Sequence, residues 1–372
     1  CYMGQGALLL ARSGSITNPF LLLFPESTRF SIVLLATLAT LIASQSVISG
    51  AFSLTRQAVQ LGFFPRMLVR YTSAREFGQI YMPFVNLMLF VVVSLLVFGF
   101  GSSVKLAGAY GMAVSGALAI DTLLFVVIMR VLWQKPLRSV VLALAVFSSV
   151  DLLFVTSNLS KVRHGGWFPL ALAAVIFLII NTWTRGQRIV TSERRILEGS
   201  LQAFVDKIRH AKPPLKRIAG HAVYISHHSD RAPLALHATV EELHELSEKV
   251  VLVTVNTTNE AHIPEDERAV FDDLRYKDDG ISHVTLSFGF HDSPNVPRAL
   301  QTLRCTNSAL DFDPDDAAYF ISLSKVVKTR RHNLSGWRKA LYTLMARNAL
   351  SVTDYYKLPV ERTVEMRSLI KL

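Results

Sequence analysis

The side chains best suited to chemistry in this sequence lie inside stretches that are otherwise apolar. They are two carboxylates, a phenol and a short run of hydroxyl and amide groups: Asp121, Asp151, Tyr110, and Ser44, Gln45 and Ser46. Oxygen atoms of these kinds replace the hydration shell of a monovalent cation without the tight grip of many carboxylates. A carboxylate at membrane depth is by default a functional hypothesis, because isolated burial of its charge is costly.

Each of these groups also has a structural interpretation. Ser and Thr commonly hydrogen-bond between packed membrane helices, and packing is the favoured reading of the run at 44–46. Asp151 lies near the centre of its apolar stretch, and a functional role and a structural pairing both remain open for it. Near Tyr110, small residues recur every four positions, which predicts a tight helix-packing seam: Ala107, Gly111, Ser115 and Ala119.

The elements that carry these residues are long apolar segments. About 20 apolar residues are needed to cross the hydrocarbon of a bilayer as a helix. The sequence predicts spans at about 30–55, 80–100, 106–129, 139–157 and 167–183, preceded by a partial span at 1–11. With no initiator methionine and no basic n-region, 1–11 does not read as a signal peptide, and we expect a fragment that begins inside a helix. Residues 1–192 are therefore predicted to be a transmembrane region.

Charge supports this division. The chain has 51% hydrophobic and 18% charged residues, which argues against a purely soluble or disordered protein. Residues 1–192 hold 14 basic and 4 acidic side chains, so the basicity follows the apolar half and does not indicate a nucleic-acid-binding domain. The basic loops at 56–79, 130–138 and after 183 are expected on the cytoplasmic side, which places the carboxyl-terminal half in the cytoplasm.

Residues 193–372, called the tail below, have the composition of a soluble domain. Strands are predicted at 221–228, 250–256, 281–290 and 317–324, and helices at 234–248, 296–304 and 335–349, which favours a cytosolic α/β domain. The last helix is basic and amphipathic. We expect it to dock within the domain through Trp337, Leu341 and Leu344 rather than to lie on a membrane surface.

Catalytic and metal-binding patterns are weak. No nucleophile or phosphate-loop motif is visible, so the sequence does not predict an enzyme or a cofactor. His237, Glu241 and His244 would share a helical face, but their spacing matches no specific metal motif, and we expect no bound metal. Two cysteines in different halves do not suggest a disulfide framework.

Read together, several segments resemble the KUP/HAK/KT family of potassium uptake permeases. They are GQGALLL (4–10), NPF (18–20), IASQSVISGAFSLTRQAVQLG (42–62), GQIYMPFVN (78–86), AYGMAVSG (109–116), VDLLFVTSNLSKV (150–162) and GGWFPL (165–170). The resemblance continues through PLALHATV and WRKALYTLMARNAL, and so covers essentially the whole chain. Met3 departs from the family, where an aromatic residue usually precedes GQGA.

The resemblance implies an α-helical polytopic membrane protein. Its fold would be the second half of an inverted-repeat, LeuT-like transporter of the amino acid/polyamine/organocation superfamily, followed by the α/β tail. The implied activity is potassium uptake by secondary active transport as a K⁺/H⁺ symport. The family's main ion-binding acids are expected upstream of Cys1. That leaves Tyr110 as the first site prediction here, with Ser44, Gln45 and Ser46 as weaker lining. Because relatives usually carry a small hydroxyl residue at position 121, a structural role is favoured for Asp121.

Two alternatives belong to other classes. One is an amino acid permease of related fold, and the other is a membrane-tethered domain that senses a nucleotide through the tail. The expected partners are the lipid bilayer, the amino-terminal half of the same protein, a second copy in a homodimer and a nucleotide regulator of the tail, but no nucleic acid. The expected location is the plasma (inner) membrane, with multiple crossings.

Overall fold

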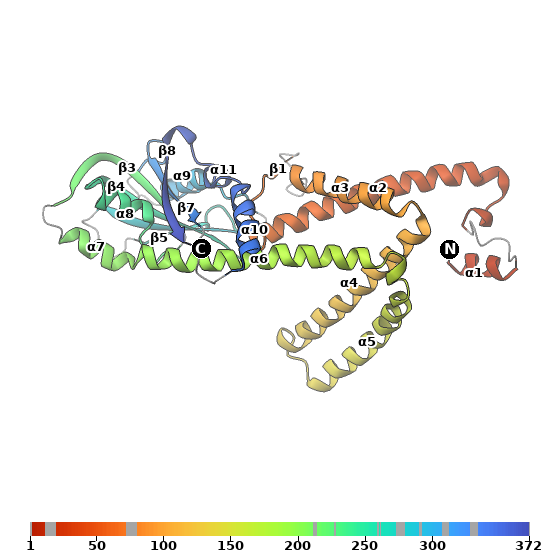
Figure 1. The fold of residues 1–372 in the computed structure, drawn as a ribbon. Helices are drawn as coiled ribbons and strands as arrows, with labels where there is room; N and C mark the ends of the chain where they lie inside the picture. The colour runs from red at the N-terminus through yellow and green to blue at the C-terminus, as the bar shows by residue number, and fades with distance from the viewer. Residues whose placement is uncertain are drawn as a thin grey trace. The chain divides into compact units, whose positions relative to one another are not determined.

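The computed structural model describes residues 2–11, 20–71, 80–210, 214–226, 228–258, 260, 262–272, 280–289, 292–306, 312–327 and 334–371 (Figure 1). These residues divide into two compact units. The first comprises residues 1–56 and 69–89, and the second comprises 57–68 and 90–372. Each unit is described separately.

Long helices dominate the amino-terminal half. Its elements are α1 (Tyr2–Ala11), the short 3-10 helix η2 (Leu21–Leu23), α2 (Glu26–Gln60), β1 (Arg70–Tyr71), β2 (Ile80–Tyr81), α3 (Pro83–Phe100), α4 (Ser103–Val131), α5 (Leu137–Leu159), η3 (Val162–His164) and α6 (Trp167–Glu198). Five of the described helices, α2 to α6, are long and apolar enough to cross a membrane. They extend beyond most of the predicted spans, and α6 runs 15 residues past the predicted end at 183.

The first unit contains most of α2. Gly50 does not interrupt this helix, although its lack of a side chain would permit a break. Several hydroxyls bond back to carbonyls of their own helix, as Thr37 does to Val33 (2.8 Å) and Ser46 to Ile42 (3.1 Å). Such bonds satisfy a hydroxyl in an apolar setting without a partner helix.

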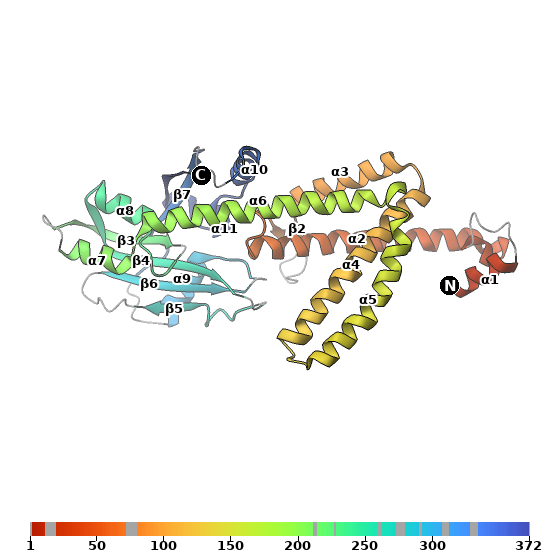
Figure 2. The ribbon, with the colours of Figure 1, turned by 60° about the horizontal axis from the view of Figure 1, so that its bottom comes forward.

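In the second unit, α4 and α5 are joined by a short turn and pack side by side (Figures 1 and 2). Pro136 is well placed just before α5, because its fixed φ suits a helix start. Arg130 in the last turn of α4 donates to the Lys135 carbonyl (3.3 Å), which helps close the turn.

The tail has seven helices and six strands among its described residues. They are the end of α6, α7 (Leu201–Arg209), β3 (Lys216–Ser226), α8 (Leu234–Glu241), β4 (Glu245–Thr257), β5 (Ala269–Asp272), β6 (Ile281–Phe288), α9 (Val296–Thr306), β7 (Ala318–Val327), α10 (Gly336–Arg347), α11 (Val352–Tyr355), η4 (Val360–Arg362) and β8 (Thr363–Lys371). The strands form one sheet in the order β5-β6-β4-β3-β7-β8. Only β5 is antiparallel to its neighbour.

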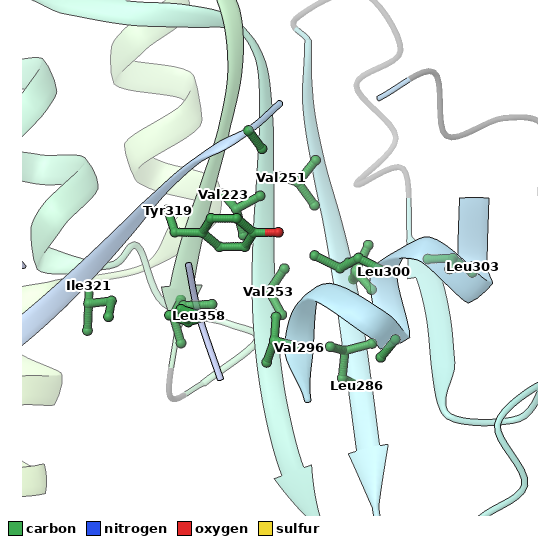
Figure 3. Packing of buried hydrophobic residues seen from close by; sticks show 14 of the residues in the cluster. Val223, Val251, Val253, Leu286, Val296, Leu300, Leu303, Tyr319, Ile321 and Leu358 are labelled. Atoms are coloured by element: carbon green, nitrogen blue, oxygen red, sulfur yellow. The ribbon is translucent and has the colours of Figure 1, made fainter. Parts of the chain in front are cut away.

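The sheet buries both faces, because alternate side chains of each strand point to opposite sides. On one face Val223 and Val251 pack with Leu300 of α9 (Figure 3). On the other, Tyr224 and Leu252 pack beneath α7 and α8. This explains why the central strands read as short continuous apolar runs.

The α/β prediction for the tail is confirmed, and each of the four predicted strands overlaps an observed one. The predicted helix at 234–248 is wrong in its second half, since α8 ends at Glu241 and β4 begins at Glu245. Lys216 of β3 pairs with Glu245, so sheet pairing extends β4 into a stretch of good helix formers. The strands β5 and β8 were not predicted.

Candidate functional site

A buried amide fixes the contact between α4 and α5. Asn158 of α5 donates to the Ser115 hydroxyl (2.7 Å) and to the Phe154 carbonyl (3.0 Å). A Cβ at Gly111 would lie 2.6 Å from the Asn158 amide oxygen, so glycine is needed there for close approach. The predicted small-residue seam is therefore confirmed at Gly111 and Ser115, whereas Ala107 is exposed.

This network continues toward the end of α5. The Lys161 ammonium donates to the Asn158 amide oxygen (3.2 Å), and the Ser115 hydroxyl donates to the Gly111 carbonyl (2.6 Å). Both ends of the amide are thus used, which is what a buried polar side chain in a membrane helix requires. From these bonds, Asn158 stabilises the packing of α4 against α5.

Asp151 lies two helical turns before Asn158 on α5, on the same helical face. Its side chain is half-buried, and Oδ2 is shielded from solvent without a hydrogen-bond partner among the described residues. A charged carboxylate oxygen in this position is costly unless a proton or a cation accompanies it. Of the two predicted acids, Asp151 is thus the one with a shielded carboxylate oxygen.

Tyr110 and Asp121 lie on α4 and are both exposed in the second unit. Tyr110 is 72% exposed, although its neighbour Gly111 faces α5. Asp121 is exposed as well, so the structure does not bring these two side chains to Asp151. Their roles stay predictions.

The polar run on α2 belongs to the first unit. Ser44, Gln45 and Ser46 are all exposed there, and the Ser46 hydroxyl is used within its own helix. They share one continuous helix, but the structure does not separate the packing interpretation from the pathway interpretation. Their role also stays a prediction.

The weak metal pattern in the tail does not assemble as a helical face. His237 and Glu241 lie on α8, but His244 lies in the turn after it with a positive φ of 57°. Glu241 instead accepts from Lys207 (2.7 Å), and this bond helps lower the pKa of its carboxyl. No group of three candidate ligands suits a metal ion within the described ranges.

The end of α6 is anchored inside the tail by a buried ion pair. Arg194 donates from Nε to Glu198 (2.6 Å) and from Nη2 to the Ser322 carbonyl of β7 (3.3 Å). Arg194 is 7% exposed and Glu198 is fully buried. The Glu198 carbonyl in turn meets His237 Nε2 at 2.9 Å, so the last turn of α6 contacts both β7 and α8.

This anchor lies beside the boundary between β3 and β7, where the order in which strands are added to the sheet reverses. β3 and β7 pair only through residues 222–225 and 318–321, and Ser322 follows directly. The Ser322 hydroxyl accepts from the Ala235 amide in the first turn of α8 (2.8 Å). In open parallel sheets, such a switch point between neighbouring strands is where ligands bind. Here α6 of the same chain occupies part of it.

A second contact joins the end of α2 and the segment that follows it to the tail, within the second unit. Gln60 donates to the Asp292 carbonyl (3.3 Å), and the Leu350 amide donates to the Arg66 carbonyl (2.8 Å). The Arg66 guanidinium also lies 5.8 Å from the Tyr355 ring centroid. Residues 57–68 are therefore held by α9, α11 and their flanking loops.

Asp292 organises the loop on which Gln60 rests. Its carboxylate accepts from the amides of Ile263 (3.1 Å) and Gly289 (2.9 Å) and contacts His262 and Arg268. Burial would raise the pKa of Asp292, but these hydrogen bonds and the Arg268 charge outweigh it and lower the pKa. The loop is thus built around a charged carboxylate.

Sequence reasoning missed the anchor of α6 and the role of Asn158. Arg194 and Glu198 have the i,i+4 spacing of an ordinary surface pair, so nothing local marks them as buried. Asn158 offered a signal, since it is an amide near the end of an apolar span.

Comparison with known proteins matches two parts of the chain to family models. Residues 1–188 match the family model described as K⁺ potassium transporter integral membrane domain, and 219–372 match K⁺ potassium transporter C-terminal domain. Similar proteins named probable potassium transport system protein Kup occur in Rhodococcus jostii (44% identical over 99% of this chain), Nitrosospira multiformis (42% over 100%) and Azoarcus sp. (41% over 100%). The chain spans 56–58% of the length of these relatives.

Proposed function

Because the chain belongs to the KUP/HAK/KT family of potassium transporters, we propose that it takes part in potassium uptake across the plasma membrane. The match of both halves to potassium transporter models carries this proposal. Its relatives are named as transport proteins and not as enzymes, and the transported ions are substrates rather than cofactors. The multi-pass membrane half supplies the pathway.

Coupling to protons is part of the same proposal. Asp151 supports it, because a shielded carboxylate oxygen without a hydrogen-bond donor favours a proton or a cation as its partner. Tyr110 and the run from Ser44 to Ser46 are proposed as further lining. By the family's pattern, α2 to α4 would belong to the second repeat of an inverted-repeat transporter, and α5 and α6 would be the two extra helices that follow it. The amino-terminal half of the protein would complete the pathway.

Growth of a potassium-uptake-deficient strain tests the substrate. The full-length protein should restore growth at low potassium, and amino acid uptake should not change. Failure to restore potassium-dependent growth with the protein present in the membrane would reject potassium uptake. Uptake of an amino acid instead would favour the permease alternative.

Asp151→Asn tests the coupling residue, with Asp121→Asn as the matched control. Both variants remove one carboxylate from an apolar helix, but only Asp151 has a shielded oxygen without a partner. We expect Asp151→Asn to lower proton-coupled rubidium uptake by roughly tenfold or more, since catalytic proton transfer is commonly worth that much. Asp121→Asn should retain uptake. Full activity of Asp151→Asn would remove Asp151 from the pathway.

We propose a regulatory role for the tail on the cytoplasmic side, with a nucleotide as its ligand and a homodimer as the assembly. The parallel sheet has a switch point between β3 and β7, and this supports a ligand at the carboxyl ends of these two strands. Calorimetric titration of the full-length protein in detergent with nucleotides tests the ligand. If no binding heat is seen at the highest nucleotide concentration, the tail does not have this role.

A further inference from the structure

The helix α10 lies across α6 where α6 leaves its apolar stretch. Both views show α10 crossing α6 rather than running along it (Figures 1 and 2). Tyr342 of α10 stacks on Trp183 with ring centroids 5.3 Å apart and donates to Gln187 (3.4 Å). A Cβ at Gly186 would overlap the Tyr342 ring, so the two helices meet as closely as glycine allows.

The docking face of α10 differs from the predicted one. Tyr342, with Leu334, Met345 and Ala346, packs against α6, whereas Trp337 and Leu344 are 53% and 59% exposed. The predicted docking through Trp337, Leu341 and Leu344 is therefore wrong at Trp337 and Leu344, whereas Leu341 is half-buried. Trp337 and Leu344 are seven positions apart and share the helical face opposite Tyr342, because seven residues make two turns. Two large apolar side chains are left without cover on that face.

The depth of α10 follows from its contacts. α10 meets α6 at Trp183, Gly186 and Gln187. The apolar stretch of α6 ends at Trp183, and at 1.5 Å per residue Gln187 lies about 6 Å beyond that end. The headgroup layer extends about 5–8 Å beyond the hydrocarbon on each side. If α6 crosses the bilayer, a helix that lies across it at these residues runs in the plane of the headgroups.

Basic residues outnumber acids in the sequence on both elements of the crossing. Residues 317–353 contain seven Lys and Arg residues and no Asp or Glu, whereas the rest of the tail has 18 basic and 24 acidic residues. Arg338 lies over the Trp337 ring (5.4 Å to the centroid), and Arg347 is exposed at the end of α10. On α6, Arg185 and Arg188 are exposed beside the crossing, and no acid occurs between Asp151 and Glu193. This distribution complements an anionic surface.

We propose that the exposed face of α10 binds the anionic phospholipid surface of the membrane that α6 crosses. Trp337 and Leu344 insert among the headgroups, where Trp is favoured, and Arg338 and Arg347 contact lipid phosphates. The tail is thereby held at the membrane by a further point, besides the covalent connection through α6 and the contacts of residues 57–68. This interaction does not depend on which ion is transported.

Fluorescence quenching by labelled lipid tests this contact in the full-length protein. A fluorophore is attached at Leu344→Cys, in a background in which every other cysteine, including Cys1 and Cys305, is replaced by Ser. The matched control is Leu243→Cys, which replaces a leucine of nearly equal exposure (58%) in the turn between α8 and β4. Vesicles contain equal parts of phosphatidylcholine and phosphatidylglycerol, with a nitroxide near the headgroup of one lipid. We expect loss of most fluorescence at position 344 and little change at position 243.

The charge contribution is tested by moving the nitroxide between the two lipids. Labelled phosphatidylglycerol should quench position 344 more strongly than labelled phosphatidylcholine. Arg338→Gln with Arg347→Gln should reduce this preference roughly fivefold for each arginine, the effect of one basic residue near an anionic surface. Circular dichroism and an unchanged signal at position 243 confirm that the variants fold.

Two outcomes would overturn the proposal. Equally weak quenching at positions 344 and 243 would place the α10 face in water. Absence of lipid quenching at 344, together with cross-linking between two chains through Leu344→Cys, would assign this face to a second copy of the chain instead.

Discussion

Single residues decide how the tail is joined to its last membrane helix. Glu198 is fully buried. Among the described residues its side chain bonds to Arg194 through Oε1, and Oε2 has no hydrogen-bond partner. A buried ion pair is weak support for stability in itself, because both charges lose their hydration. Removing one partner is a different matter, since the other charge is then buried alone.

Arg194→Met should therefore destabilise the tail by about 3–5 kcal/mol. The double variant Arg194→Met with Glu198→Met should recover much of that loss, because it leaves no buried charge. Urea unfolding of the full chain in detergent, followed by tryptophan fluorescence, measures both. If the double variant is less stable than the single one, Glu198 has a favourable role of its own.

Buried His283 makes the tail sensitive to acid. Its Nε2 lies 3.0 Å from the Thr254 hydroxyl, and burial lowers its pKa below 6.5 against the attraction of Asp272. At pH 6.5, the His283 side chain binds a proton more readily in the unfolded chain than in the folded chain. Stability from this residue is thus complete above pH 6.5 and is lost as the pH falls from 6.5 toward the folded pKa.

His283→Gln should flatten this dependence, because glutamine can still bond Thr254 but does not titrate. Thermal midpoints of the full chain in detergent, measured from pH 7.5 down to about 5.5 around the His pKa, provide the comparison. The exposed His210→Gln is the control and should keep the slope of the parent. Parallel curves for parent and His283→Gln would contradict the assignment.

At this scale, sequence revealed residues that contrast with their surroundings. Asp151 stands out as an acid in an apolar run, and Gly111 and Ser115 as small residues at regular spacing. Arg194 and Glu198 do not stand out, because burial of an i,i+4 pair depends on the strand that covers it and not on the pair itself.

Among the elements, α10 depends most on one close approach. Gly186 is the position where a side chain on α6 would overlap the Tyr342 ring. Gly186→Ala should destabilise the docking of α10 by about 1–3 kcal/mol, as overpacking commonly does. The measurement is the thermal midpoint of the full chain.

Gly116→Ala on α4 is the matched control, because a Cβ there meets nothing within 4 Å. Its thermal midpoint should differ from that of the parent by no more than the difference in helix propensity between Gly and Ala accounts for. A second variant, Tyr342→Ala, removes the ring, so adding Gly186→Ala to it should have little further effect. An equal loss in both backgrounds would show that the ring is not the obstacle.

Elements were predictable where their pattern was strong and local. The apolar lengths of α2 to α6 and the β-branched runs of β3, β4, β6 and β7 were sufficient. The stretch at 245–249 favours a helix by composition, but pairing with β3 makes it a strand. β8 was missed although its residues 363–367 alternate between polar and apolar, which is the pattern of a half-buried strand. It lies at the edge of the tail sheet beside β7.

At the scale of the second unit, α6 links the membrane half to the tail without a break. It has 32 residues, about 48 Å at 1.5 Å per residue, and Glu198 is already buried when the helix ends at Gly199. Spin labels at Phe177→Cys and Leu243→Cys should therefore give a narrow distance distribution. Thr191→Gly with Ser192→Gly should broaden it, and Gly116→Ala should not. A broad distribution in the parent would contradict a rigid link.

The positive φ of Gly199 (63°) marks the first change of direction after the last membrane helix, and it comes only after Arg194 has bonded to β7. The orientation of the sheet is consequently fixed relative to the axis of α6. When the last span tilts, the strands tilt by the same amount, so the direction of the sheet relative to the membrane normal reports the tilt of that span.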